Sequence, residues 1–275
     1  MSTSWLARHL SDVKLIDVQP DVHDYIACHI PSAVHLNENS MKSTYEGLPA
    51  RYLSPEHMPE IMGRAGIAPF DPAVVYTGKG EVSTSGDGLE QYAFAYLLLR
   101  FGHKQVYLLD GGLDKWVADH RPSTKELPRV IQTRYSPVVD GTVLIRLHEL
   151  LDVKDDPNTV LLDARKPDVY SGDSGIWLRK GHIPGAINLP WFLLVNADNR
   201  TRIKPVEEVK KLVEQVGATG DKLIICSCGI GRSATVQYTI IKHLLGYEKV
   251  KLYEGSYLEW SADPKRPVVK GQKPR

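Results

Sequence analysis

One cysteine stands where its surroundings could turn it into a nucleophile. Cys228 follows the apolar run 223–227 and is succeeded by a short loop made of Gly229, Ile230, Gly231, Arg232 and Ser233. An apolar-periodic run then continues to Gly246, so the pattern predicts a buried strand, a tight loop and a helix with Ser233 near its first turn. Loop amides and a helix start concentrate positive potential, which favours the thiolate, the reactive form of cysteine.

Length and charge limit the classes of function. The chain has 275 residues, enough for two domains that each bury a core, and its 34 Lys and Arg against 33 Asp and Glu give a formal net charge of +1. This balance gives no reason to expect nucleic acid or an acidic membrane surface as a partner. Any anionic substrate must therefore be bound by local charge in a cleft.

The cysteine count indicates a reducing compartment. Cys28, Cys226 and Cys228 are too few for a disulfide framework. The N-terminus has no basic segment followed by a long apolar run, and no stretch has the apolar length of a membrane span. We therefore expect a cytoplasmic monomer without a membrane partner. We expect no metal either, because His29 and His182 have no second ligand at metal spacing.

Strands and helices alternate along the first half of the chain. Short apolar runs at 14–18, 73–77 and 106–110 predict strands, and the segments 54–65 and 89–101 predict helices. Such alternation is typical of an α/β fold in which helices flank a parallel sheet.

The pattern is interrupted by a proline-containing segment and then begins again. Polar sequence with Pro122, Pro128 and Pro137 predicts an extended, semi-rigid linker. We expect an N-terminal domain over 1–121, the linker over 122–140 and a C-terminal domain over 141–275.

The two halves repeat the same motifs at the same distances. The run His-Ile-Pro occurs at 29–31 and again at 182–184, and equal spacings separate Gly102, Gly111 and Trp116 in one half and Gly246, Gly255 and Trp260 in the other. Matched spacings of this kind predict a duplicated domain. In the first copy the loop after the strand 73–77 has no cysteine. We therefore expect the second copy alone to be catalytic.

On these residues the chain resembles the tandem-domain rhodaneses, the thiosulfate and 3-mercaptopyruvate sulfurtransferases. The resemblance is carried by the two His-Ile-Pro segments, by Asp163-Ala-Arg165, by the strand that leads into Cys228, and by the closing motif Glu254-Gly-Ser-Tyr-Leu-Glu-Trp260. It covers nearly the whole chain. It implies two rhodanese-like domains, each a parallel sheet flanked by helices, with an inactive first domain and a catalytic second one.

The resemblance also implies a mechanism. Cys228 attacks the sulfane sulfur of a small-molecule donor such as thiosulfate and keeps it as a persulfide, which cyanide or a thiol acceptor then removes. The amides of the loop from Gly229 to Ser233, which includes the charge of Arg232, stabilise the negative persulfide without a cofactor. Arg165 is expected to hold the anionic part of the donor through its forked N–H groups.

Two positions bear on the choice of donor. Two residues after the nucleophile, thiosulfate enzymes of this family often carry a basic residue and mercaptopyruvate enzymes a serine, whereas this chain has Ile230. A second arginine shortly after Arg165, which resembles a mercaptopyruvate-binding feature, is absent from 166–170. We predict thiosulfate as the donor, with mercaptopyruvate as the alternative.

Two other functions fit parts of the sequence. The run from Cys226 to Ser233 resembles the phosphate loop of protein tyrosine phosphatases, in which Cys226 would attack phosphorus and Arg232 would cradle the phosphate. Against this, Cys226 would have to leave the strand early, and no aspartate loop can be identified as the general acid. We therefore expect Cys226 to be a small, buried strand residue. The other alternative is a persulfide carrier without enzymatic turnover, which the presence of Cys228 makes less favoured.

Overall fold

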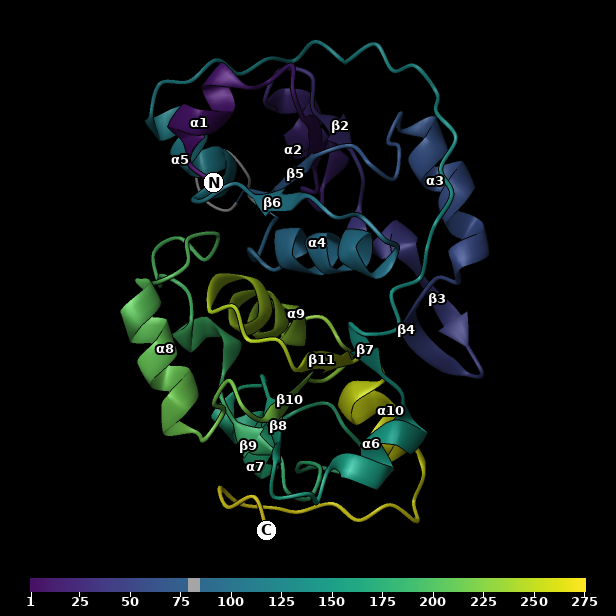
Figure 1. The fold of residues 1–275 in the computed structure, drawn as a ribbon, viewed down its shortest axis with the longest axis vertical. Coiled ribbons are helices and arrows are strands. Elements are labelled where there is room, and N and C mark those ends of the chain that lie inside the picture. Colours follow the sequence, from purple (N-terminus) through teal and green to yellow (C-terminus); the bar gives the residue numbers. More distant parts are fainter. Residues whose placement is uncertain (79–84) are drawn as a thin grey trace. The chain divides into compact units, whose positions relative to one another are not determined.

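The computed structural model describes residues 1–78 and 85–275, which form two units (Figure 1). Unit 1 consists of Met1–Ser43, Tyr52–Asp140 and Val195–Ile203. Unit 2 consists of Thr44–Arg51, Gly141–Leu194 and Lys204–Arg275. Each unit therefore contains a short segment from the other half of the sequence.

Unit 1 is built on a four-stranded parallel sheet in the order β2-β1-β5-β6. Its strands are β1 (Lys14–Asp17), β2 (Val34–His35), β5 (Ala73–Tyr76) and β6 (Val106–Leu108). Its helices are α1 (Thr3–Arg8), α2 (Val22–Ala27), α3 (Met58–Arg64), α4 (Glu90–Arg100) and α5 (Gly112–Ala118). A separate hairpin of β3 (Lys42–Tyr45) and β4 (Leu48–Tyr52) lies mostly within Thr44–Arg51, the segment that belongs to unit 2.

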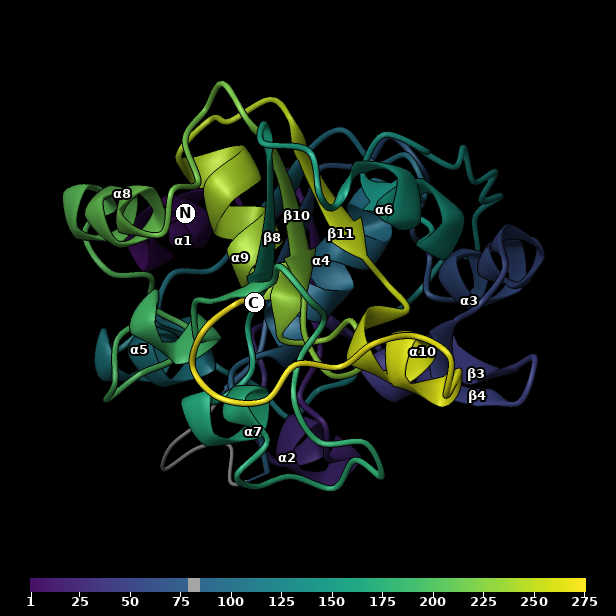
Figure 2. The same ribbon diagram turned by 90° about the horizontal axis from the view of Figure 1, so that it is seen from below.

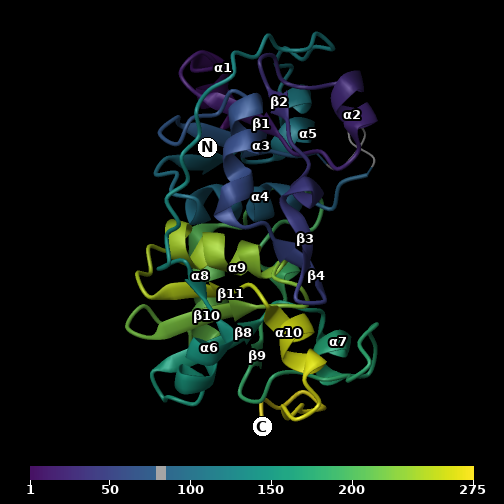
Figure 3. The same cartoon turned by 90° about the vertical axis from the view of Figure 1, so that its right-hand side faces the viewer.

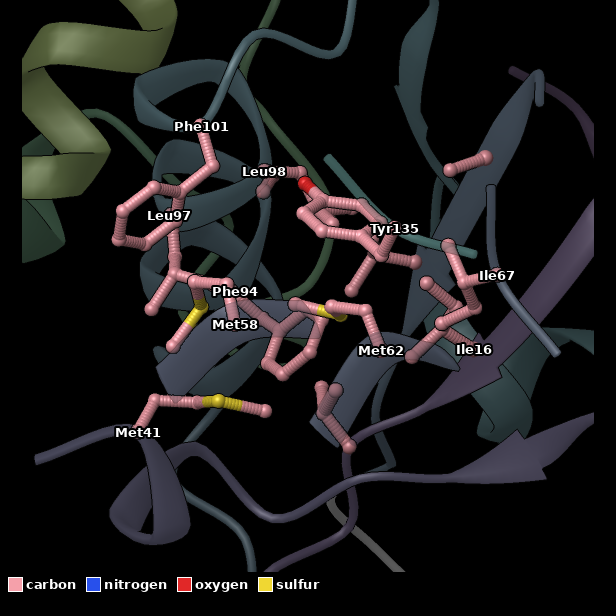
Figure 4. Close-up of a cluster of buried hydrophobic side chains, with 14 residues drawn as sticks. Ile16, Met41, Met58, Met62, Ile67, Phe94, Leu97, Leu98, Phe101 and Tyr135 are labelled. Atoms are coloured by element: carbon pink, nitrogen blue, oxygen red, sulfur yellow. The ribbon is translucent and has the colours of Figure 1, made fainter. Parts of the chain in front are cut away.

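The main core of unit 1 lies between α3, α4 and the sheet. Figure 4 shows Met58 and Met62 of α3 beside Phe94 and Leu98 of α4, all buried in one cluster. Tyr135, from the proline-containing segment, is buried in the same cluster at 3% exposure. This segment therefore contributes a side chain to the core, in addition to connecting the two halves.

Helix α4 is buried on almost all sides, which explains its run of apolar and aromatic residues. It has 11 residues. Throughout the described part of the chain, no helix combines the length and apolarity needed to cross a membrane.

Unit 2 is built on a five-stranded parallel sheet in the order β7-β11-β10-β8-β9. Its strands are β7 (Leu144–Ile145), β8 (Thr159–Asp163), β9 (Ile187–Asn188), β10 (Leu223–Ser227) and β11 (Val250–Tyr253). Its helices are α6 (Leu147–Val153), α7 (Pro167–Ser171), α8 (Val206–Gln215), α9 (Ala234–Thr239) and α10 (Ser256–Ala262). A π-helical turn, Ile240–Leu244, extends α9.

Strand β10 occupies the centre of this sheet, between β8 and β11 (Figure 2). Figure 3 shows α9 on one side of the sheet and α6, α7 and α10 on the other. On the latter side, Leu161, Ile225 and Tyr253 pack in one core with Tyr257 and Trp260 of α10. The sheet around β10 is thus covered by helices on both faces.

Strand register shows which residue of the first copy corresponds to the cysteine. Asp17 of β1 pairs with Tyr76 of β5, and Asp163 of β8 pairs with Ser227 of β10. The next residues, Thr77 and Cys228, are therefore equivalent. Residues 79–84, which belong to the loop without a cysteine in the first copy, lie outside the described residues. The predicted α/β fold, with two copies of a helix-flanked parallel sheet, is confirmed.

Candidate active site

Cys228 is held between the end of β10 and the first turn of α10. Its side chain is 2% exposed, and its backbone N–H donates to Ser256 Oγ at 3.0 Å. The N–H of Tyr257 donates to the carbonyl of Cys228 at 2.9 Å, and the N–H of Leu258 donates to that of Gly229 at 2.8 Å. These hydrogen bonds fix the backbone of the cysteine before any substrate binds.

Ser256 combines a hydroxyl group with an unusual backbone conformation. Its Oγ lies 4.0 Å from Cys228 Sγ and donates to the carbonyl of Tyr253 at 2.8 Å. Its φ is +49°, in the left-handed region that favours glycine. The equivalent residue of the first copy is Gly112, with φ +59°. The second copy therefore accepts local strain at the position where it places a hydroxyl beside the cysteine.

Arg165 is held by a carboxylate and an aromatic ring. Its Nε lies 3.0 Å from each oxygen of Asp163, and its Nη2 donates to Asp163 Oδ2 at 2.6 Å and to the carbonyl of Gly181 at 2.9 Å. The guanidinium carbon lies 4.1 Å from the centre of the Tyr257 ring. Arg165 is 6% exposed, and its buried Nη1 has no hydrogen-bond partner among the described residues.

Tyr257 brings the predicted nucleophile and the predicted anion-binding residue together. Its backbone bonds Cys228, and its ring faces Arg165. Arg165 also forms a buried ion pair with Asp163. Because that pair engages only Nε and Nη2, it orients the guanidinium and leaves Nη1 for another acceptor.

The five predicted loop residues lie between β10 and α9, directly after Cys228. Gly231 has φ +78°, and a Cβ there would lie 2.6 Å from the carbonyl oxygen of Glu254. Only glycine fits this close approach to the end of β11. Ile230, Arg232 and Ser233 are half-buried.

Cys226 has a different environment, although it is only two residues away. It lies within β10, paired with Leu162 on one side and Leu252 on the other, and it is 0% exposed. Burial raises the pKa of its thiol well above the usual range, and the neighbouring Cys228 adds to this shift. Cys226 is therefore a small, buried strand residue, as the sequence predicts, and its thiol is poorly suited to nucleophilic attack.

The two histidines of the repeated motif bind backbone carbonyl groups. His29 Nδ1 lies 2.7 Å from the carbonyl of Tyr25, and His182 Nδ1 lies 3.0 Å from that of Tyr170. Both histidines are therefore buried, hydrogen-bonded residues of the repeated motif. Among the described residues, no group of three His, Cys, Asp or Glu is placed to hold a metal ion.

Sequence reasoning did not single out Ser256, Tyr257 or Trp177. The indole of Trp177 lies against the loop, since a Cβ on Gly229 would be 2.8 Å from its Cζ2 atom. The ring also meets Tyr257 edge to face, with centroids 5.6 Å apart and planes at 85°. One sequence signal was available: the segment before the second His-Ile-Pro motif is longer than the segment before the first.

Arg51, from β4, is a fourth residue that the sequence did not indicate. Its Nη2 lies 3.4 Å from Glu259 Oε1 of α10. Its Nη1 would lie 2.8 Å from a Cβ on Gly255, next to Ser256. Because β4 is remote in sequence from α10, no local pattern points to this contact.

Comparisons with known proteins agree with this fold. The rhodanese-like domain family matches residues 2–119 and 146–263. A sulfur carrier protein of Thermus thermophilus is 33% identical over 99% of this chain and 96% of its own length. A thiosulfate sulfurtransferase of Corynebacterium glutamicum is 31% identical over 99% of this chain and 90% of its own length.

A solved structure extends the likeness to three dimensions. SseA of Escherichia coli, described as a 3-mercaptopyruvate sulfotransferase, is 25% identical to this chain and superposes with a TM-score of 0.77. The match covers 94% of this chain and 98% of that one. With both halves matched by the same domain family, the chain belongs to the rhodanese family of sulfurtransferases as a tandem-domain member.

Proposed function

We propose that the protein moves a sulfane sulfur from thiosulfate to cyanide or a thiol through a persulfide on Cys228. The observation that carries this proposal is that one residue, Tyr257, supports both Cys228 and Arg165. Tyr257 bonds the backbone of Cys228 and stacks against the guanidinium of Arg165, whose Nη1 is buried and has no partner among the described residues. A nucleophile and an anion-binding group that are both held by one residue are suited to a doubly charged donor.

The reaction proceeds in two displacements. The Cys228 thiolate attacks the sulfane sulfur of thiosulfate, a new S–S bond forms, and sulfite leaves with the electron pair of the broken S–S bond. An acceptor thiolate or cyanide then attacks the outer sulfur of the persulfide, and the Cys228 thiolate leaves. Arg165 binds the oxygens of the donor in the first step and faces the developing charge of sulfite.

The role of Cys228 is tested by substitution of each neighbouring cysteine. Cys228→Ser should lower turnover of thiosulfate and cyanide by at least about a thousandfold, because it removes the nucleophile. Cys226→Ala is the matched control, since its thiol is buried within β10. It should keep most of the activity. The measurements are thiocyanate release and a mass spectrum after thiosulfate treatment, in which one extra sulfur atom should be found on the peptide that contains Cys228.

The same experiment addresses the phosphatase alternative. Hydrolysis of an aryl phosphate that is lost in Cys226→Ala and retained in Cys228→Ser would contradict the sulfur-transfer proposal. The position of Cys226 inside the central strand, and the raised pKa of its thiol, argue against that outcome.

We further propose that thiosulfate is preferred over mercaptopyruvate. The support comes from Ile230, which is not the serine expected in mercaptopyruvate enzymes, and from the lack of a second arginine in 166–170. The relative from Corynebacterium glutamicum bears the thiosulfate name. We expect kcat/KM to be higher for thiosulfate than for mercaptopyruvate in parallel assays. A reversed order would establish the second candidate, which the likeness to SseA favours.

A carrier role is a further candidate because of the relative from Thermus thermophilus, which is named a sulfur carrier protein. The two roles differ in turnover. An enzyme of the proposed kind releases many equivalents of thiocyanate per protein molecule, whereas a carrier accepts one sulfur and does not pass it to small acceptors. Multiple turnovers with cyanide would therefore separate the first role from the second.

A further inference from the structure

Unit 2 contains an inserted loop that unit 1 lacks. In both units a tyrosine ring stacks on the histidine of the repeated motif, with centroids 4.1 Å apart for Tyr25 and His29 and 3.7 Å for Tyr170 and His182. The tyrosine and histidine are separated by four positions in unit 1 and by twelve in unit 2. The additional residues therefore lie between two points that the duplication keeps equivalent.

The inserted loop is firmly attached to the rest of unit 2. Arg179 Nη1 donates to the carbonyl of Asp263 at 2.7 Å, and Tyr257 donates through its hydroxyl to the carbonyl of Arg179 at 2.5 Å. Ile176 and Leu178 are 94% and 100% exposed, while Trp177 between them is half-buried. The loop thus holds the indole of Trp177 at a fixed position.

Trp177 contacts the site through two neighbours. Its indole lies against Gly229, the residue after the nucleophile, and occupies the space that a side chain there would need. Its edge-to-face contact with Tyr257 is the first of two linked ring contacts, because the face of Tyr257 is in turn 4.1 Å from the guanidinium carbon of Arg165. A movement of the indole would therefore release the ring that supports Arg165, whereas the backbone of Cys228 and Gly229 would stay held by the N–H groups of Tyr257 and Leu258.

We propose that Trp177 is a positioning residue for donor binding, acting on Arg165 through Tyr257. Asp163 holds one edge of the guanidinium, and the Tyr257 ring covers its face. Trp177 fixes the position of that ring, so that Nη1 stays directed at the donor while Cys228 keeps its place. This inference rests on the proposed sulfur transfer and deepens it, because it assigns the geometry of donor recognition to the inserted loop.

The test separates the binding of the donor from the later steps. In Trp177→Ala we expect the KM for thiosulfate to rise about tenfold, as for loss of an ordered cationic contact, while kcat changes by less than about twofold. The KM for cyanide should stay unchanged, because the acceptor attacks the persulfide and does not need Arg165. Trp177→Phe should recover most of the affinity, since a phenyl ring can keep an edge-to-face contact with Tyr257.

Leu178→Ala is the matched control. Leu178 is the next residue of the same loop and is fully exposed, so its truncation should leave the KM for thiosulfate unchanged. Trp177→Leu keeps the position apolar without an aromatic ring, and it replaces the alanine variant if thermal unfolding shows that the latter does not fold. An unchanged KM in the folded variants, or a phenylalanine variant no better than leucine, would overturn the inference.

Direct binding distinguishes failure of this inference from failure of the proposed function. Thiosulfate binding to Cys228→Ser is measured by calorimetry with and without Trp177→Ala. If the parent protein forms no persulfide but binding still weakens without the indole, the sulfur-transfer proposal fails and the role of Trp177 stands. If binding is equally strong with and without the indole, the role of Trp177 is refuted whether or not the protein transfers sulfur.

Discussion

At position 256 a serine has a backbone conformation that the other copy of the domain gives to glycine. The hydroxyl accepts the N–H of Cys228 at 3.0 Å and lies 4.0 Å from its sulfur. Because both groups are buried, water is poorly placed to replace this hydrogen bond. The strained backbone of Ser256 lowers the stability of the fold, whereas its hydrogen bond to Cys228 raises it. Substitutions that remove only one of these two effects can therefore separate them.

We expect Ser256→Ala and Ser256→Gly to lower the rate of persulfide formation to a similar extent, because both leave the N–H of Cys228 without its acceptor. Their stabilities should differ. Alanine retains the strain at φ +49°, whereas glycine relieves it, so the glycine variant should be the more stable by about 1 kcal/mol. Urea unfolding and single-turnover kinetics measure the two effects. An alanine variant at least as stable as the glycine variant would show that the backbone is unstrained.

At the scale of elements, the strands and the cysteine loop follow from local pattern. Apolar runs and turn residues placed β1, β5, β6 and β10 close to their observed bounds, and the loop from Gly229 to Ser233 lies where its glycines predict. These signals are local because a buried strand and a tight turn each constrain adjacent residues. The repeat then identified the copy that lacks the cysteine.

The residues that support the site could not be predicted from local sequence patterns. Tyr257 and Ser256 act on Cys228 only because α10 starts beside the end of β10, a consequence of strand order. Trp177 lies in a loop that differs from its counterpart in the first repeat by its length, and no sequence motif marks it. Arg51 reaches α10 from a hairpin about two hundred residues away in the chain, a distance over which side-chain pairing leaves no pattern in one sequence.

The proline-containing segment contributes to the stability of unit 1 through Tyr135. Its hydroxyl lies 3.1 Å from Nδ1 of the buried His103. Burial lowers the pKa of His103 below its ordinary value of 6.5, although the charge of Asp71 opposes the shift. As the pH falls below 6.5, the unfolded chain takes up a proton that the folded chain does not, so the free energy of unfolding decreases.

We therefore expect the free energy of unfolding to fall between pH 7.5 and pH 5.5, and to fall less in His103→Gln. The exposed His57 supplies the control, because His57→Gln should retain the pH dependence of the parent protein. Denaturant unfolding at several pH values measures the slope. Parallel slopes for His103→Gln and the parent protein would exclude His103 as the source.

At the scale of the whole molecule, two short segments are exchanged between the units. Each segment comes from one half of the sequence but belongs to the unit that is formed mainly by the other half. Val195–Ile203 belongs to unit 1, where Asn199 Nδ2 donates to the carbonyl of Gly111 at 2.9 Å and Gln91 Nε2 donates to that of Thr201 at 3.2 Å. Thr44–Arg51 belongs to unit 2, where Arg51 pairs with Glu259. The two sequence repeats and the two units are therefore not the same divisions of the chain.

This exchange of segments bears on how the protein can change by recombination. A crossover between two relatives within 122–140 would preserve each sequence repeat but would join Gly111 and Gln91 from one parent to Asn199 and Thr201 from the other. In such a chimaera, the residues that form these hydrogen bonds must be compatible with each other, although they come from different repeats and different parents. A substitution at Asn199, for example, removes a hydrogen bond whose acceptor, the carbonyl of Gly111, comes from the other sequence repeat.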